Sequence, residues 1–115
     1  MGIRIEIPGL PPSMNQYNGR QNVWKYRRDK QEWKDLVVLH CKRQREPFEY
    51  AIVTITYYFK DKRRHDPDNY SGKFILDGLT AAGIIKDDDF KHIELRLCAG
   101  TDKKRPRTQI DVKEV

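Results

Sequence analysis

The segment from Tyr50 to Phe59 constrains the fold of this chain more than any other part of the sequence. It reads Tyr-Ala-Ile-Val-Thr-Ile-Thr-Tyr-Tyr-Phe, and such β-branched and aromatic residues fit the pleated surface of a sheet. Three further segments alternate between apolar and polar residues, which also predicts strands: residues 3–7, 92–98 and 108–112. The chain is therefore expected to build a sheet that includes residues 50–59.

Two segments have the periodicity of helices. Between Val23 and Gln44, apolar residues recur at spacings of three and four, as one buried helix face requires: Trp33, Leu36, Val37 and Cys41. A second helix is predicted from Asn69 to Ala82, with Gly83 as its C-terminal stop. A long loop from Pro8 to Gly19 precedes the first helix, because Pro and Gly interrupt both regular periods.

These elements follow one another in the order β-α-β-α-β-β. The simplest architecture for that order is an α/β (α+β) fold, in which two helices pack on a small mixed β-sheet. The chain has 115 residues and no linker or internal repeat, so residues 1–115 are expected to form a single domain.

The composition indicates an anionic partner, with mere solubility as the alternative reason for the basic charge. Lys and Arg number 23 against 17 Asp and Glu, which gives a net charge of +6. No apolar run approaches the roughly 18 residues that a membrane-spanning helix needs, so no membrane association is expected. The polar start of the chain and two distant cysteines, Cys41 and Cys98, predict a cytoplasmic protein with reduced, buried thiols.

Acidic residues are concentrated on either side of the second predicted helix. Asp66-Pro67-Asp68-Asn69 precedes it and Asp87-Asp88-Asp89 follows it. An extended Asp-Pro-Asp would place both carboxylates on one side of the chain, where they could share a hard cation. Asp88 would supply a third carboxylate only if the chain folds back, because a helix of some 14 residues spans about 20 Å.

Structural roles are the alternative for both acidic segments. Asp66-Pro67-Asp68 could form an N-cap and a turn, because Asp is favoured at helix N-termini. Asp87-Asp88-Asp89 could be a solvated surface run.

In combination, the motifs resemble the RusA family of Holliday junction resolvases, of phage or prophage type. The resemblance runs from residue 3 to about residue 98. It rests on the loop Pro11-Pro12-Ser13-Met14-Asn15-Gln16-Tyr17, on Asp66-Pro67-Asp68-Asn69, on Asp77-Gly78-Leu79-Thr80-Ala81-Ala82-Gly83 and on the pair Asp87-Asp88.

The resemblance implies a structure-selective endodeoxyribonuclease that resolves four-way DNA junctions in recombination and repair. Such an enzyme would be a homodimer that makes paired cuts in the junction. It would require Mg²⁺, for which Mn²⁺ could substitute. The family's metal-binding aspartates correspond to Asp66, Asp68 and Asp88, and Asp87 and Asp89 are alternatives for the third.

The family's functional lysine corresponds less directly to this sequence. It commonly follows the second aspartate by four residues, where this chain has Gly72, and Lys73 comes one position later. One extra residue near Tyr70-Ser71-Gly72 would restore Lys73 to a catalytic position. The alternative is a surface lysine that pairs with Asp77 at i,i+4.

Cations near the acidic segments are candidates for contacts with DNA phosphates, which give affinity without reading sequence. Asn15 and Tyr17 could also contact DNA, or could instead stabilise their loop. Two other functions remain open: a non-catalytic basic DNA-binding module, and a nuclease of other branched DNA. The candidate phosphate-binding residues are Arg63, Arg64, His65, Arg27, Arg28 and Lys30.

Overall fold

The computed structural model describes residues 1–19 and 22–115. Its elements follow the predicted order β-α-β-α-β-β, and within these described ranges two short 3-10 turns, η1 and η3, are inserted into the loops. The bounds are β1 Gly2–Pro8, η1 Met14–Tyr17, α1 Val23–His40, β2 Ala51–Phe59, η3 Pro67–Asn69, α2 Lys73–Ala81, β3 Ile93–Thr101 and β4 Arg107–Glu114.

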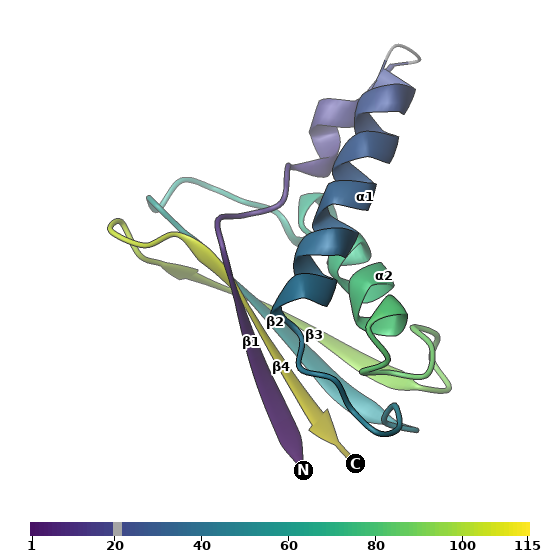
Figure 1. Cartoon of the computed structure of the whole chain (residues 1–115). Coiled ribbons are helices and arrows are strands. Elements are labelled where there is room, and N and C mark those ends of the chain that lie inside the picture. The colour runs from purple at the N-terminus through teal and green to yellow at the C-terminus, as the bar shows by residue number, and fades with distance from the viewer. Residues whose placement is uncertain (20–21) are drawn as a thin grey trace.

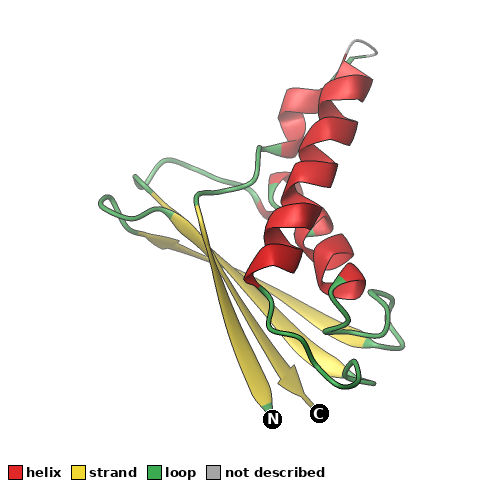
Figure 2. Cartoon of the chain, viewed as in Figure 1, coloured by secondary structure: helices red, strands yellow, loops and turns green. Residues whose placement is uncertain are grey.

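The four strands form one mixed sheet in the order β1-β4-β2-β3. Strand β4 is antiparallel to both of its neighbours, whereas β2 and β3 are parallel, with Ala51 opposite Ile93 and Phe59 opposite Thr101. Both helices cover the same face of the sheet (Figures 1 and 2). The predicted mixed sheet with two helices packed on it is therefore confirmed.

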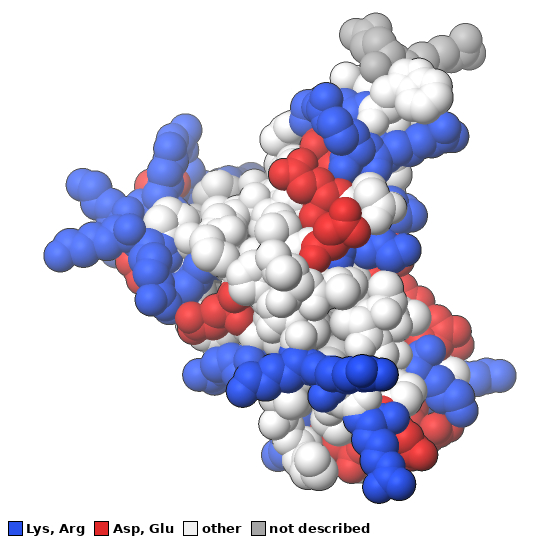
Figure 3. Space-filling view, viewed as in Figure 1, with Lys and Arg blue, Asp and Glu red and all other residues white. Residues whose placement is uncertain are grey.

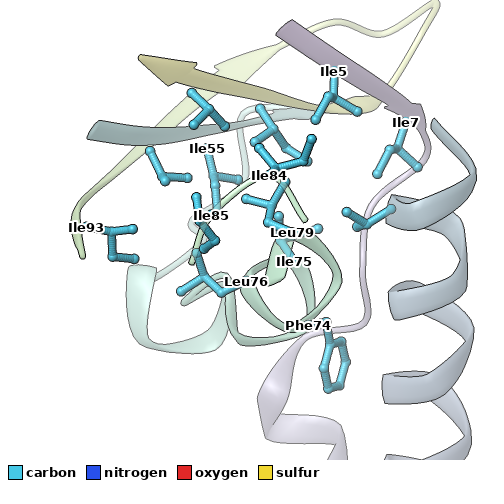
Figure 4. Close-up of a cluster of buried hydrophobic side chains, with 14 of the residues drawn as sticks. Ile5, Ile7, Ile55, Phe74, Ile75, Leu76, Leu79, Ile84, Ile85 and Ile93 are labelled. Atoms are coloured by element: carbon cyan, nitrogen blue, oxygen red, sulfur yellow. The ribbon is translucent and has the colours of Figure 1, made fainter. Parts of the chain in front are cut away.

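The hydrophobic core lies between the helices and this face of the sheet. Residues of β2 alternate regularly between buried and half-buried positions, as a strand with one covered face requires. Figure 4 shows Ile5, Ile55, Ile75 and Leu79 converging from strands and from α2, and each of them is at most 4% exposed. Burial of each such side chain contributes about 1.5–3 kcal/mol to stability.

Several predicted boundaries are wrong by a few residues. Helix α1 ends at His40 rather than Gln44. The backbone of Cys41 is extended, and residues 42–44 are polar and add nothing to the apolar face of the helix. Helix α2 begins at Lys73 rather than Asn69, and β3 continues to Thr101. The predicted stop at Gly83 is confirmed: its φ is +74°, and Ile84 N–H donates to Leu79 C=O at 3.0 Å.

Both cysteines are free, but only Cys41 is partly buried. The prediction of two buried thiols is wrong for Cys98, which is exposed on β3 at the edge of the sheet. Among the described residues, no helix is both long enough and apolar enough to cross a membrane.

Replacement of Leu79 by Ala should lower the free energy of unfolding by about 2–5 kcal/mol, because the side chain is fully buried and its loss leaves a cavity. The matched control is Leu39→Ala, since Leu39 is 77% exposed and should tolerate the change within about 0.5 kcal/mol. Urea denaturation of both variants measures the difference. Equal losses would contradict the described core.

Candidate active site

Asp66 and Asp68 lie in the connection between β2 and α2. Asp66 is extended, with φ −100° and ψ 139°, and is the N-cap of η3, although its side chain makes no capping hydrogen bond. The chain then turns at Pro67, and Asn69 N–H donates to Asp66 C=O at 3.0 Å. The predicted extended Asp-Pro-Asp is therefore wrong beyond Asp66, because the fixed φ of proline suits the first residue of a helical turn.

An aromatic cluster anchors this connection to the sheet. The His65 ring stacks on Phe59, with centroids 3.7 Å apart and planes 5° apart. Tyr70 packs edge-on against both rings. About a quarter (27%) of the His65 side chain is exposed, and its Nε2 lies 3.8 Å from Asp61. His65 thus fixes the chain immediately before Asp66, while its predicted phosphate contact stays a prediction.

Gly72 separates η3 from α2. Its φ of +87° is a left-handed conformation, and a Cβ there would lie 2.7 Å from Ile55 Cδ1. The Gly72 carbonyl accepts the first hydrogen bonds of α2, from Ile75 and Leu76. Lys73 is consequently the first residue of α2. The sequence predicts one extra residue near Tyr70-Ser71-Gly72, and in the structure these residues lie between the turn η3 and the start of the helix.

Lys73 projects from the start of α2 towards α1. Its Nζ lies 5.5 Å from the centroid of the Tyr26 ring, and the Tyr26 hydroxyl raises the pKa of the lysine. The alternative prediction, an i,i+4 ion pair between Lys73 and Asp77, does not appear among the ion pairs of the described residues. Asp77 lies instead 3.4 Å from Lys30 Nζ of α1.

Asp88 lies beyond the C-terminal end of α2, at a cleft of about 620 Å³ between the two helices. Asp77 and Asp87 line the same cleft, opposite Arg27 and Lys30 of α1. Partial burial raises the pKa of the Asp88 carboxyl, and Asp87 and Asp77 raise it further. This end of α2 therefore concentrates negative charge, which a bound cation would neutralise.

A second group of metal-ligand atoms lies in the same segment. Asp87, Asp89 and His92 each offer one ligand atom, and these atoms lie within 4.8 Å of one another. The His92 Nδ1 also bonds to Asp89, and this bond lowers the pKa of the Asp89 carboxyl. These oxygen and nitrogen donors suit a divalent cation, although Mg²⁺ prefers oxygen ligands alone.

In a single chain, the two acidic sets lie at opposite ends of α2. Asp66 lines a small pocket with Leu97, Cys98 and Ala99, in the C-terminal half of β3. Asp88 lines a pocket with Ile93, Glu94 and Leu95, at the start of β3. Four residues along a strand correspond to about 13 Å. Ligands of one ion at distances near 2.1 Å must lie closer together than these two stretches of β3 do.

The predicted phosphate-binding cations fall into two groups. Arg63 and Arg64 are exposed on the connection before η3, where Arg63 pairs with Asp61 and Arg64 with Asp66, each at 3.0 Å. Arg27, Arg28 and Lys30 lie on α1, where Arg27 and Lys30 border the cleft. Both groups therefore lie next to acidic residues of the candidate site.

Asn15 and Tyr17 belong to η1, which packs beside α1. Asn15 is exposed and accepts a hydrogen bond from Ser13. The Tyr17 hydroxyl donates to Asp29 Oδ2 at 2.8 Å, and burial together with this bond raises the pKa of Tyr17. Tyr17 also packs edge-on against Phe74 at the start of α2. These contacts favour the alternative role of Tyr17, in which it stabilises its loop and does not contact DNA.

Sequence reasoning gave no site role to three residues that the structure places beside the carboxylates. Asp77 is the first residue of the motif Asp77-Gly78-Leu79-Thr80-Ala81-Ala82-Gly83, on which the resemblance partly rests. Its place in that motif was the signal that could have indicated a role in the site. His92 and Phe59 gave no such signal, because an isolated His and a strand aromatic are ordinary core or surface residues. Their roles depend on chain segments that meet only after folding.

A comparison with models of protein families places the chain among the DNA-cutting hydrolases. The model described as Endodeoxyribonuclease RusA matches residues 8–113. Because the match spans nearly the whole of the 115 residues, the chain belongs to the RusA endodeoxyribonuclease family. No curated protein matched the chain in a separate search. The enzyme is thus an endodeoxyribonuclease of a family that resolves Holliday junctions, as the resemblance implied.

Gly72→Ala should destabilise the protein by about 1–2 kcal/mol from the left-handed backbone and by a further 1–3 kcal/mol from the contact with Ile55. Gly9→Ala is the matched control, since Gly9 has a φ of +86° but no atom lies within 4 Å of the place that a Cβ would take. Chemical denaturation should show the larger loss for Gly72→Ala. Similar losses would contradict the tight contact at the start of α2.

Proposed function

We propose that this endodeoxyribonuclease uses Mg²⁺, or Mn²⁺ in its place, to resolve four-way DNA junctions by paired phosphodiester hydrolysis. The observation that carries the proposal is the concentration of carboxylates at both ends of α2 in a chain of net charge +6. Carboxylate oxygens are the ligands that Mg²⁺ prefers. When bound, the ion would lower the pKa of a water and neutralise charge on the scissile phosphate.

Asp66, Asp68 and Asp88 are the proposed metal ligands. The Asp66 side chain is 45% exposed and Asp68 is exposed, so both carboxylates are accessible at the end of β2. Partial burial raises the pKa of the Asp88 carboxyl, and Asp87 and Asp77 raise it further, so a bound cation would favour the charged form of this carboxylate. Asp87 and Asp89 stay alternatives, because they form the compact group with His92.

Lys73 is proposed to place a positive charge beside the reacting phosphate. It begins α2, and three residues separate it from the end of η3, so its position is coupled to that of Asp68 through Gly72. The ammonium of a lysine is charged at neutral pH, and Tyr26 raises the pKa of Lys73 further. A fixed cation at this point would stabilise charge that develops on the phosphate oxygens.

A homodimer would reconcile the separated carboxylates. Strand β3 is an edge strand, and among the described residues it pairs only with β2. If β3 paired with β3 of a second copy in antiparallel fashion, the start of one strand would lie beside the end of the other. Asp88 of the second copy would then approach Asp66 and Asp68 of the first, on the helix-covered face.

The side chains along this edge support such pairing. Phe90, three residues before the start of β3, is 98% exposed, and Leu95 and Leu97 are only partly covered. An antiparallel pair would carry Phe90 towards the partner's aromatic pocket at the C-terminal half of β3, which Phe59 and other apolar residues line. Burial of an exposed Phe contributes about 1.5–3 kcal/mol, so the dimer would also remove an unfavourable exposed surface.

A dimer with two active sites also fits the substrate. A four-way junction is nearly two-fold symmetric, and its resolution requires two cuts. Arg63, Arg64 and His65 before η3 and Arg27, Arg28 and Lys30 on α1 would contact phosphates near each cut. The alternative substrates are other branched DNAs, which a panel of flaps, forks and four-way junctions would separate.

Asp66→Asn, Asp68→Asn and Asp88→Asn should each reduce Mg²⁺-dependent cleavage of a synthetic four-way junction by at least about 100-fold, because each removes an anionic ligand from the metal. Junction binding should be kept or strengthened, since each change removes negative charge near the DNA. Cleavage is measured on denaturing gels with Mg²⁺ and with a chelator, and binding is measured separately.

Asp111→Asn is the matched control for that experiment. Asp111 lies on β4 and pairs with the exposed Arg4, at the other side of the sheet from β3. Its loss should leave cleavage unchanged. Intact junctions after incubation of the unmodified enzyme with Mg²⁺ or Mn²⁺ would contradict the proposed function.

A further inference from the structure

Two basic segments that are distant in the sequence meet at one end of the sheet. The first is the connection after β2 (residues 60–66), and the second is the turn between β3 and β4 (residues 102–107). Asp102 N–H donates to Phe59 C=O at 2.7 Å, which holds the two segments side by side. Together they contain eight Lys and Arg residues and three Asp residues. We call this region the basic end (Figure 1).

The turn at the basic end is internally braced. The Asp102 carboxylate accepts hydrogen bonds from the backbone N–H groups of Lys104 and Arg105, at 3.2 and 3.0 Å. Arg107 donates to the same carboxylate at 2.7 Å, and its guanidinium lies 4.1 Å from the centroid of the Tyr58 ring. Asp102 and Arg107 therefore hold the shape of the turn and present its tip as a preformed surface.

Some cations at the basic end are already compensated. Arg105 pairs with Glu6 at 3.1 Å, and Arg63 and Arg64 pair with aspartates of their own segment. Four lysines are exposed and form no ion pair with any residue that the structure describes: Lys60, Lys62, Lys103 and Lys104. Figure 3 shows Lys and Arg side chains projecting into solvent at this end of the molecule.

The basic end is continuous with the proposed metal site. The connection that begins at Lys60 ends at Asp66, and Asp66 shares a pocket with Phe59 and Ala99 near the ends of β2 and β3. Lys103 and Lys104 lie two and three residues beyond the end of β3. A DNA strand that reaches Asp66 therefore passes close to these lysines, and their charge is complementary to its phosphates.

We propose that Lys103 and Lys104, supported by Lys60 and Lys62, bind backbone phosphates of the duplex arm that leads to the cleavage site. This inference rests on the proposed function, since it assumes that DNA reaches Asp66. Lysines that contact phosphates position a duplex and do not read its sequence or its branching. The basic end therefore adds affinity for duplex arms, and it leaves the preference for a junction to other parts of the enzyme.

The test measures binding of Lys103→Ala/Lys104→Ala to a labelled four-way junction and to a linear duplex, in chelator and over a series of salt concentrations. The slope of log K against log salt should become shallower by about two for each subunit that holds a duplex arm, because each such subunit loses two phosphate contacts. Affinity should fall for the linear duplex as well as for the junction. Lys103→Arg/Lys104→Arg should restore the slope of the unmodified enzyme.

Lys113→Ala is the control, since Lys113 is exposed near the other end of β4. It should leave the slope unchanged, and thermal unfolding of all variants should be unaltered because these side chains make no ion pair in the described structure. An unchanged slope for the Lys103/Lys104 variant, or weaker binding of the junction alone, would overturn the inference. Mg²⁺-dependent cleavage by the unmodified enzyme is scored separately, and its absence would overturn only the proposed function.

Discussion

The parallel pairing of β2 with β3 determines where every candidate catalytic residue lies. Two parallel neighbours cannot be joined by a tight turn, so the chain must cross the sheet between them, and here α2 makes that crossing. The connection after β2 therefore opens at one end of α2, and the connection before β3 opens at the other. Asp66 and Asp68 lie in the first, and Asp88 lies in the second.

This separation gives the proposed dimer its physical basis. The stretches of β3 beside Asp66 and beside Asp88 are about 13 Å apart, so a partner chain would be needed to bring both carboxylates to one Mg²⁺ ion. Antiparallel pairing of two β3 edges would reverse the direction of the strand and so bring opposite ends of the two α2 helices together. Assembly would then be a condition for metal binding, and two complete sites would form at once for the two cuts.

Charge is organised around the same elements. Acidic residues before α2 and within it lie within reach of cations, such as Arg64 beside Asp66 and Lys30 beside Asp77. The first pair is exposed and the second is partly exposed, so both contribute little to stability, which comes from the apolar layer between the sheet and the helices. The cations at the candidate site are therefore available for phosphates at small cost to the fold.

Much of the fold could be predicted from local patterns in the sequence. The alternation within residues 51–59, the apolar spacing in α1 and the stop at Gly83 are local signals, and all three appear in the structure. The neighbours of each strand, the turn at Pro67 and the stacking of His65 on Phe59 depend on contacts between distant segments, which no local period encodes. The aspartates were identifiable as a set, but their division between the two ends of α2 follows from the parallel crossover.

The most direct test of shared sites mixes two inactive variants, Asp66→Asn and Asp88→Asn, under conditions in which subunits exchange. If Asp66 of one chain and Asp88 of its partner serve the same ion, a mixed dimer contains one site with both changes and one intact site. Mg²⁺-dependent nicking of a four-way junction should then return in the mixture, although neither variant is active alone. Persistent inactivity of mixed dimers that bind the junction would contradict the account.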